Sequence, residues 1–293
     1  MNARLLRATT LLVGTLAAGY VGYTRPDAAS TTLDAGMILG ASEAVATAGP
    51  SGARVLAPRP SAAQQSYADI NAPYDAKYHF VRIRYDVGGG GFGRRRGGRE
   101  PAWAHDYPRA EHNFLKIIDE TTYVVPQTEG SNVLTLDDPE LFKYPIAYIV
   151  EVGSWNPTDE EVASLGEYLL KGGFLIVDDT RNERGNEWAN FAYHMERALP
   201  GLALVPLDHG HDIFDSFFEV NPAAVIPPYG RYPAEYFAIF EDNDPDKRML
   251  VLFNFNNDIA EYWEYSDMGY FPIELSNEAY KLGVNYIVYA LTH

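Results

Sequence analysis

The stretch Lys171-Gly-Gly-Phe-Leu-Ile-Val-Asp-Asp179 decides the fold of this chain. Its two glycines are typical of a turn that ends a helix, and the four apolar residues after them are typical of a strand buried on both faces. Two carboxylates follow where that strand ends. Ligands of open α/β sheets bind at the carboxyl ends of the strands, so this stretch predicts a parallel sheet and the edge that carries its site.

Similar apolar runs recur along the chain and predict the other strands. The predicted strands are residues 80–85, 123–125, 146–150, 174–177, 202–205 and 249–253. Helical patterns lie between them, so strands and helices alternate. We therefore expect an α/β fold of three layers, with a mainly parallel sheet that helices cover on both faces.

Helix starts are also marked in the sequence. Thr158 and Glu161 have the spacing of a capping box. Asp106 precedes Pro108 and is a candidate N-cap for an earlier helix. Ser276 is the candidate cap of the last helix. These signals predict where three of the helices begin.

The chain divides into three segments by composition. Residues 1–29 have the form of a signal peptide or membrane anchor, because Arg4 and Arg7 precede a mostly apolar run and then small residues. Residues 30–77 are rich in Ala, Ser, Thr, Pro and Gly, which predicts a disordered tether. Residues 78–293 then form one α/β domain. We expect an exported protein, periplasmic or envelope-associated, with membrane contact only through an uncleaved N-terminal segment.

Charge and cysteine content exclude several classes of function. The formal net charge is −17, and residues 1–77 carry six basic and five acidic residues, so the negative charge belongs to the predicted domain. Nucleic acid is a poor partner for such a body. The chain has no cysteine, which excludes disulfides, thiolate metal sites and a cysteine nucleophile.

Asp178 and Asp179 admit a functional and a structural interpretation. At the end of a parallel strand they are candidates for metal binding or for a general base. As structural residues, one of them would cap the next helix or pair with Arg181 or Arg184. The sequence leaves both interpretations open.

A second group of candidate residues follows the strand predicted to end at residue 205. Imidazole and carboxylate groups within five positions suit Zn, Mn or Fe. A closed metal site needs three or four ligands, so this loop would need a carboxylate from the end of strand 174–177. Otherwise a histidine here caps or packs the turn before Phe214. The candidate metal ligands are Asp178, Asp179, His209, His211 and Asp212, and a divalent metal is the candidate cofactor.

Two further loops are compatible with binding. Residues 254–258 (Asn-Phe-Asn-Asn-Asp) and 261–265 (Glu-Tyr-Trp-Glu-Tyr) combine amides with aromatic rings, which suits a neutral polar ligand such as a sugar or peptide. They also suit ordinary turns. Residues 88–98 hold seven glycines and three consecutive arginines without a phosphate-loop pattern. That loop is either an anion cradle or a basic loop lying on the acidic body.

An ordered set of motifs resembles a bacterial family, the one known as domain of unknown function 4159. The motifs are Phe80-Val-Arg-Ile-Arg-Tyr85, Trp103-Ala-His-Asp-Tyr-Pro108 with Asn113, Gly172-Gly-Phe-Leu-Ile-Val-Asp-Asp179, Asp208-His209 with Ile213-Phe214, Asn256-Asn-Asp258 and Leu282-Gly-Val-Asn285. From these motifs and the strand ends, the candidate ligand-binding residues are Arg82, Arg84, Trp103, Asp106, Tyr107, Asp178, Asp179, Asn256, Asn257 and Asp258.

The resemblance implies a flavodoxin-like fold of the class I glutamine amidotransferase-like kind and no established activity. The nucleophile elbow of such amidotransferases would fall on residues 178–180 (Asp-Asp-Thr). Those enzymes need a cysteine at that position, so thioester chemistry is excluded here.

Three functions remain open. The first is a non-catalytic domain of the bacterial envelope that binds a small molecule, glycan or peptide in a cleft at the strand ends. The second is a metal-assisted hydrolase of an amide, ester or glycan, with His209 and one carboxylate of the 178–179 pair as metal ligands. The third is an assembly module that docks to an envelope protein complex through its arginine loop and acidic body.

Overall fold

The computed structural model describes residues 71–87, 101–181 and 186–293. The predicted signal or anchor segment 1–29 and the glycine-arginine loop 88–98 lie outside the described residues. So does Arg184, one of the two expected partners of the paired carboxylates.

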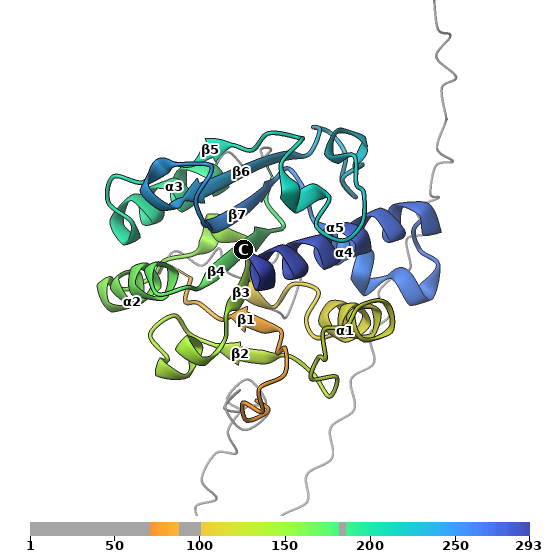
Figure 1. Ribbon diagram of the computed structural model, residues 1–293, viewed down its shortest axis with the longest axis horizontal. Coiled ribbons are helices and arrows are strands. Elements are labelled where there is room, and N and C mark those ends of the chain that lie inside the picture. Colours follow the sequence, from red (N-terminus) through yellow and green to blue (C-terminus); the bar gives the residue numbers. More distant parts are fainter. Residues whose placement is uncertain (1–70, 88–100, 182–185) are drawn as a thin grey trace, which may run out of the picture. The chain divides into compact units, whose positions relative to one another are not determined.

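The centre of the domain is a seven-stranded, mainly parallel sheet (Figure 1). Its strands are β1 Val81–Ile83, β2 Asn132–Leu134, β3 Ile146–Val150, β4 Phe174–Asp178, β5 Val205–Pro206, β6 Glu235–Phe240 and β7 Met249–Phe255. The order is β2-β1-β3-β4-β7-β6-β5, in which β6 is antiparallel to both of its neighbours. The five parallel strands follow the order typical of flavodoxin-like doubly wound sheets. The predicted α/β fold is therefore confirmed.

Helices cover both faces of the sheet, as the continuous apolar strands require (Figure 1). They are α1 Arg109–Thr121, α2 Asp159–Leu170, α3 Glu187–Ala198, α4 Ile259–Glu264 and α5 Ile273–Thr292. Helices α1, α4 and α5 share one hydrophobic core with the sheet, and α2 and α3 share the other. Among the described residues, no helix combines the length and the apolar character that crossing a membrane requires.

The turn that decides the fold forms as predicted. The Thr158 hydroxyl accepts a hydrogen bond from Glu161 N at 3.1 Å, and the Glu161 carboxylate accepts one from Thr158 N at 2.8 Å. This capping box begins α2. Gly172 has a φ of +117°, a left-handed conformation that ends the helix and turns the chain into β4.

Two predicted helix caps are wrong, although α1 does begin at Pro108 as expected. Helix α5 begins at Ile273, three residues before Ser276, so Ser276 lies within its first turns. Pro108 occupies the N-cap position of α1, and the side chain of Asp106 accepts no capping hydrogen bond. Asp106 is thus available for another role.

The edges of the sheet also differ from prediction. Residues 123–125 do not form a strand, because the side chain of Tyr123 is fully exposed and Val125 is 61% exposed. Strand β2 forms instead at Asn132–Leu134, where Asn71 and Ala72 hydrogen-bond to it. The folded body therefore includes residues 71–77, which the sequence assigned to the tether. Strand β5 has only two residues, and β6 was not predicted.

Candidate functional site

The carboxyl ends of β4 and β7 lie side by side, and the polar residues after them form the candidate site. Beyond the last paired residues of these strands, Thr180 N donates to Asn257 O at 3.1 Å, and the Thr180 hydroxyl donates to Asn254 O at 2.6 Å. Asp179 and Asn256 have positive φ angles of 46° and 55°. Asp and Asn tolerate this left-handed conformation, which turns each chain sharply at the end of its strand.

Asp178 is a structural residue. Its fully buried Oδ2 accepts hydrogen bonds from the Tyr148 hydroxyl at 2.7 Å, from Ile259 N at 2.9 Å and from Ala260 N at 3.2 Å. Its Oδ1 accepts one from the Asn254 amide at 3.2 Å. Burial raises the pKa of Asp178 to about 6, although these hydrogen bonds favour its charged form. Asp178 thus caps a helix, but this helix is α4 rather than the next one along the chain.

Asp179 faces the opposite way and contacts the side chains of His105 and Arg181. Its Oδ2 lies 2.5 Å from His105 Nδ1, and its Oδ1 accepts a hydrogen bond from Arg181 Nη2 at 2.9 Å. The same Arg181 nitrogen donates to Asp258 Oδ2 at 3.2 Å. The expected pair with Arg181 is confirmed, and this arginine connects the ends of β4 and β7.

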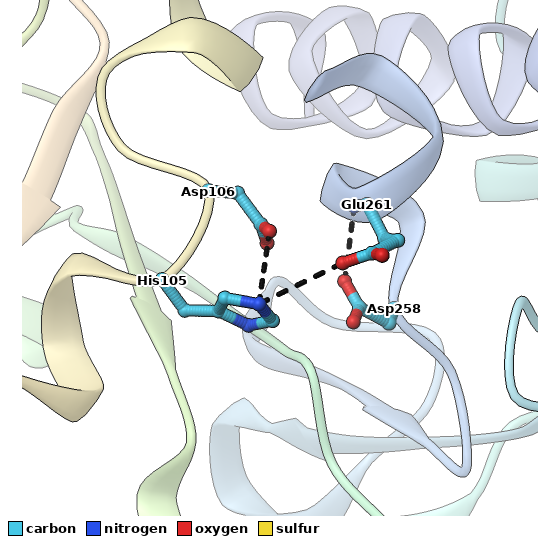
Figure 2. A group of neighbouring side chains, drawn as sticks. All are labelled: His105, Asp106, Asp258 and Glu261. Carbon is cyan, nitrogen blue, oxygen red and sulfur yellow. Dashed lines mark hydrogen bonds and ion pairs between the residues drawn. The ribbon is translucent and has the colours of Figure 1, made fainter. Parts of the chain in front are cut away.

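The other nitrogen of His105 faces a group of carboxylates (Figure 2). His105 Nε2 lies 3.2 Å from Asp106 Oδ1 and 3.6 Å from Glu261 Oε2. Asp258 caps α4 by accepting a hydrogen bond from Glu261 N at 3.1 Å. One donor atom from each of these four buried residues lies within 4.8 Å of the others. We call His105, Asp106, Asp258 and Glu261 the histidine-carboxylate group. An imidazole in these surroundings can carry a proton or bind a metal ion.

The carboxylates of this group are electrostatically crowded. Burial raises the pKa of Asp106 well above its ordinary value, and the charges of Asp179 and Glu261 raise it further. Burial likewise raises the pKa of Asp258, and the neighbouring Asp179 and Asp106 add to this shift. Neither carboxylate oxygen of Asp106 accepts a hydrogen bond from the described residues. The arrangement favours binding of a proton or a cation.

A pocket of about 160 Å³ opens to solvent beside this group. Asp258 and Arg181 belong to its wall, and the Arg181 guanidinium lies 3.9 Å from the centre of the Tyr229 ring. The side-chain amide of Asn257 is buried, and neither of its polar atoms makes a hydrogen bond with the described residues. The lining residues are Arg181, Pro227, Tyr229, Gly230, Arg231, Tyr232, Asn256, Asn257 and Asp258. The pocket can hold a small polar ligand.

Five of the predicted ligand-binding residues meet at this edge of the sheet. Asp106, Asp179 and Asp258 surround His105, and Asn256 and Asn257 line the pocket. The structure therefore brings these five residues together, as the strand-end interpretation expected. Because side chains alternate along a strand, only one of Asp178 and Asp179 can face the site, and it is Asp179.

Other predicted ligand-binding residues hold the turn that carries His105, pack in the core or are exposed to solvent, and they do not line the pocket. Arg82 is fully buried, pairs with Glu111 and donates from Nη1 to Trp103 O at 3.2 Å. It therefore anchors the turn that carries His105 and does not line the pocket. Trp103 packs in the core with its ring 6.2 Å from that of Tyr107, and Arg84 is exposed.

The structure does not bring the predicted metal ligands together. The His211 ring packs 5.8 Å from that of Phe240, which pairs with Met249 at the start of β7, whereas Asp178 lies beside the end of β7. His211 and Asp178 therefore lie near opposite ends of β7. His211 Nδ1 accepts a hydrogen bond from Ile213 N, so this histidine caps the turn at residues 212–214, the alternative the sequence left open.

The remaining members of that set do not complete a metal site either. His209 is exposed, and Asp212 lines a separate surface pocket with His211 and His293. Asp178 Oδ2 accepts a hydrogen bond from the start of α4, and Asp179 lies beside His105. After β5 the chain reverses direction and brings His211 to Phe240, which pairs with the start of β7. The His and Asp residues of this loop give no sequence signal of that reversal.

Sequence reasoning did not select His105 or Tyr229 as site residues, and it considered Glu261 only within residues 261–265, a segment suited to a neutral polar ligand. His105 stands in the Trp103–Pro108 motif beside Asp106, so a histidine next to a carboxylate was a usable signal. Glu261 follows Asp258 by three positions, the spacing that places both at one helix start. Tyr229 lies in a loop whose sequence carries no such signal.

Comparison with known proteins supports the family that the motifs resemble. No curated protein matches the chain. The family model described as "Domain of unknown function" matches residues 79–291, which includes every residue of the site. The chain therefore belongs to the DUF4159 family.

Proposed function

We propose that this chain is an exported protein of the bacterial envelope that binds a polar small molecule, glycan or peptide in the pocket at the carboxyl edge of its sheet. The observation that carries the proposal is the buried Asn257 amide, whose donor and acceptor make no hydrogen bond with the described residues at the wall of an open pocket. A buried polar group without a partner is costly, so a ligand that bonds to it gains affinity and specificity.

The rim of the pocket supports the same class of ligand. Tyr229 and Tyr232 line it and are 45% and 42% exposed. Aromatic faces next to hydrogen-bonding groups suit sugar rings and peptide groups. The net charge of −17 favours neutral or cationic ligands over nucleic acid.

The test is equilibrium dialysis with a thermal-shift screen of cell-wall sugars, short peptides and nucleotides. We expect a hit among the first two classes, weakened about 2–13-fold by Tyr232→Ala, because an aromatic contact contributes roughly 0.5–1.5 kcal/mol. Tyr123→Ala is the matched control, since Tyr123 is fully exposed and does not line the pocket. Absence of any hit, or equal weakening by both variants, would contradict the proposal.

Export is proposed from residues 1–29 alone. In a Gram-negative host, the full-length protein should fractionate outside the cytoplasm, and removal of residues 1–23 should keep it inside. Full-length protein found in the cytoplasm would refute this part and leave the binding proposal standing.

A further inference from the structure

The histidine-carboxylate group has the composition of a transition-metal site. We infer that His105, Asp106, Asp258 and Glu261 bind one divalent ion of the Zn, Mn or Fe class. One imidazole nitrogen with several carboxylate oxygens is a donor set that suits these ions. Bonds of about 2.1 Å place donors on opposite sides of an ion about 4 Å apart. The donor atoms already lie within 4.8 Å of one another, so small side-chain movements close the site.

The orientation of His105 supports this assignment. Asp179 Oδ2 lies 2.5 Å from Nδ1, so this carboxylate can accept a hydrogen bond from Nδ1–H while Nε2 faces Asp106 and Glu261. Metal-binding histidines usually carry such a carboxylate on the nitrogen that does not bind the ion, because it fixes both the tautomer and the ring. Asp179 is thus a positioning residue for the ligand nitrogen.

Asp106 provides an independent observation. Its side chain is 4% exposed and points into the group, as Figure 2 shows. Neither of its oxygens accepts a hydrogen bond from the described residues. A buried carboxylate without hydrogen-bond donors is unfavourable unless a cation takes their place. A metal ion bound between His105 Nε2 and Asp106 would supply a positive charge that no lysine or arginine of the described residues brings to this carboxylate by an ion pair.

The balance of charge points the same way. Arg181 pairs with Asp179 and Asp258, but no lysine or arginine of the described residues forms an ion pair with Asp106 or Glu261. A divalent cation would neutralise these two carboxylates. On the other side of the ring, Glu151 and Asp179 form a smaller group with Nδ1. It offers fewer ligands, and Asp179 already occupies that nitrogen.

The inference does not depend on the proposed pocket ligand, because metal binding is measured by itself. Full-length protein is stripped with EDTA, dialysed and titrated with Zn²⁺ by calorimetry and with Mn²⁺ by electron paramagnetic resonance. We expect one ion per chain. Asp106→Asn should weaken binding at least about tenfold, the loss usual when a group that supports a metal is removed. His209→Gln, in the other histidine loop, should bind like the wild type.

The variants separate loss of binding from loss of fold. Because Asp106 accepts no hydrogen bond from the described residues, Asp106→Asn should keep the unfolding midpoint of the metal-free wild type. It therefore decides the question even if His105→Gln does not fold. The inference is overturned if the stripped wild type binds neither ion, if Asp106→Asn binds as tightly as wild type, or if His209→Gln abolishes binding.

Discussion

Replacing Asp178 by alanine should destabilise the fold strongly, because it removes four hydrogen-bond acceptor contacts at once. The Tyr148 hydroxyl and the Asn254 amide can turn towards other partners, but the backbone N–H groups of Ile259 and Ala260 cannot. A buried donor left without a partner costs roughly 1–3 kcal/mol. Two such groups set the expected loss at about 2–6 kcal/mol, within the range that identifies a specific structural defect.

The isosteric change Asp178→Asn is the control. Its oxygen can still accept from the two backbone N–H groups, and its amide can face Asn254 if that side chain rotates to present its oxygen. The change also removes a charge that burial disfavours. We expect Asp178→Asn to alter the free energy of unfolding at pH 7.5 by less than about 1 kcal/mol.

The pH dependence gives a second readout with a defined sign. The pKa of Asp178 is raised by burial from 3.8 to about 6 in the folded state, so the folded protein holds this proton more tightly than the unfolded chain. Its contribution to stability is fully present below pH 3.8 and is lost as the pH rises through about 6. The stability of the wild type relative to Asp178→Asn should therefore fall between pH 5 and pH 7.5.

Urea unfolding, followed by circular dichroism in EDTA, measures all three proteins. Equal and large destabilisation by both substitutions would refute the capping argument, because the asparagine retains the needed acceptor. A relative stability that rises with pH would refute the assigned direction of the pKa shift.

Two further predictions test the packing of α3. Burial lowers the pKa of His194, and the charge of Arg197 lowers it further, so stability should fall as the pH drops below about 6.5. His194→Gln should lose less stability than wild type between pH 7.5 and 5.5, and identical urea profiles would contradict this. In Gly166→Ala the new Cβ would lie 2.2 Å from Ala198 O, so α2 and α3 must separate, at a cost of about 2 kcal/mol or more. Leu170→Ala is the exposed control on α2, and equal melting temperatures of the two variants would refute the clash.

The central strands could be predicted because burial on both faces leaves a continuous apolar run. Residues 146–150 and 174–177 have such runs, and both form strands. The short edge strand β2 begins with an asparagine whose side chain bonds to the Tyr144 hydroxyl, so its sequence lacks that signal. The apolar residues 123–125 wrongly predicted a strand. In a short exposed segment, apolar residues are not selected for packing and so do not indicate a strand.

The candidate site was predictable only where it depends on strand ends. Asp179 and Asp258 were found because a carboxylate after a parallel strand lies at the ligand-bearing edge. His105 is 74 positions from Asp179 and lies on a turn whose place is set by the buried Arg82. Such a contact arises from tertiary packing, which local sequence does not encode.

The two adjacent carboxylates of the opening motif therefore have different roles that are mechanically connected. Asp178 binds the first two N–H groups of α4, and Asp258 binds the N–H of Glu261 in the same turn. The start of α4 thus fixes where Asp258 and Glu261 stand relative to His105. Because Asp178 holds that start, its loss should loosen the histidine-carboxylate group even though Asp178 does not belong to it. The geometry of this edge of the sheet therefore depends on a carboxylate that does not line the pocket.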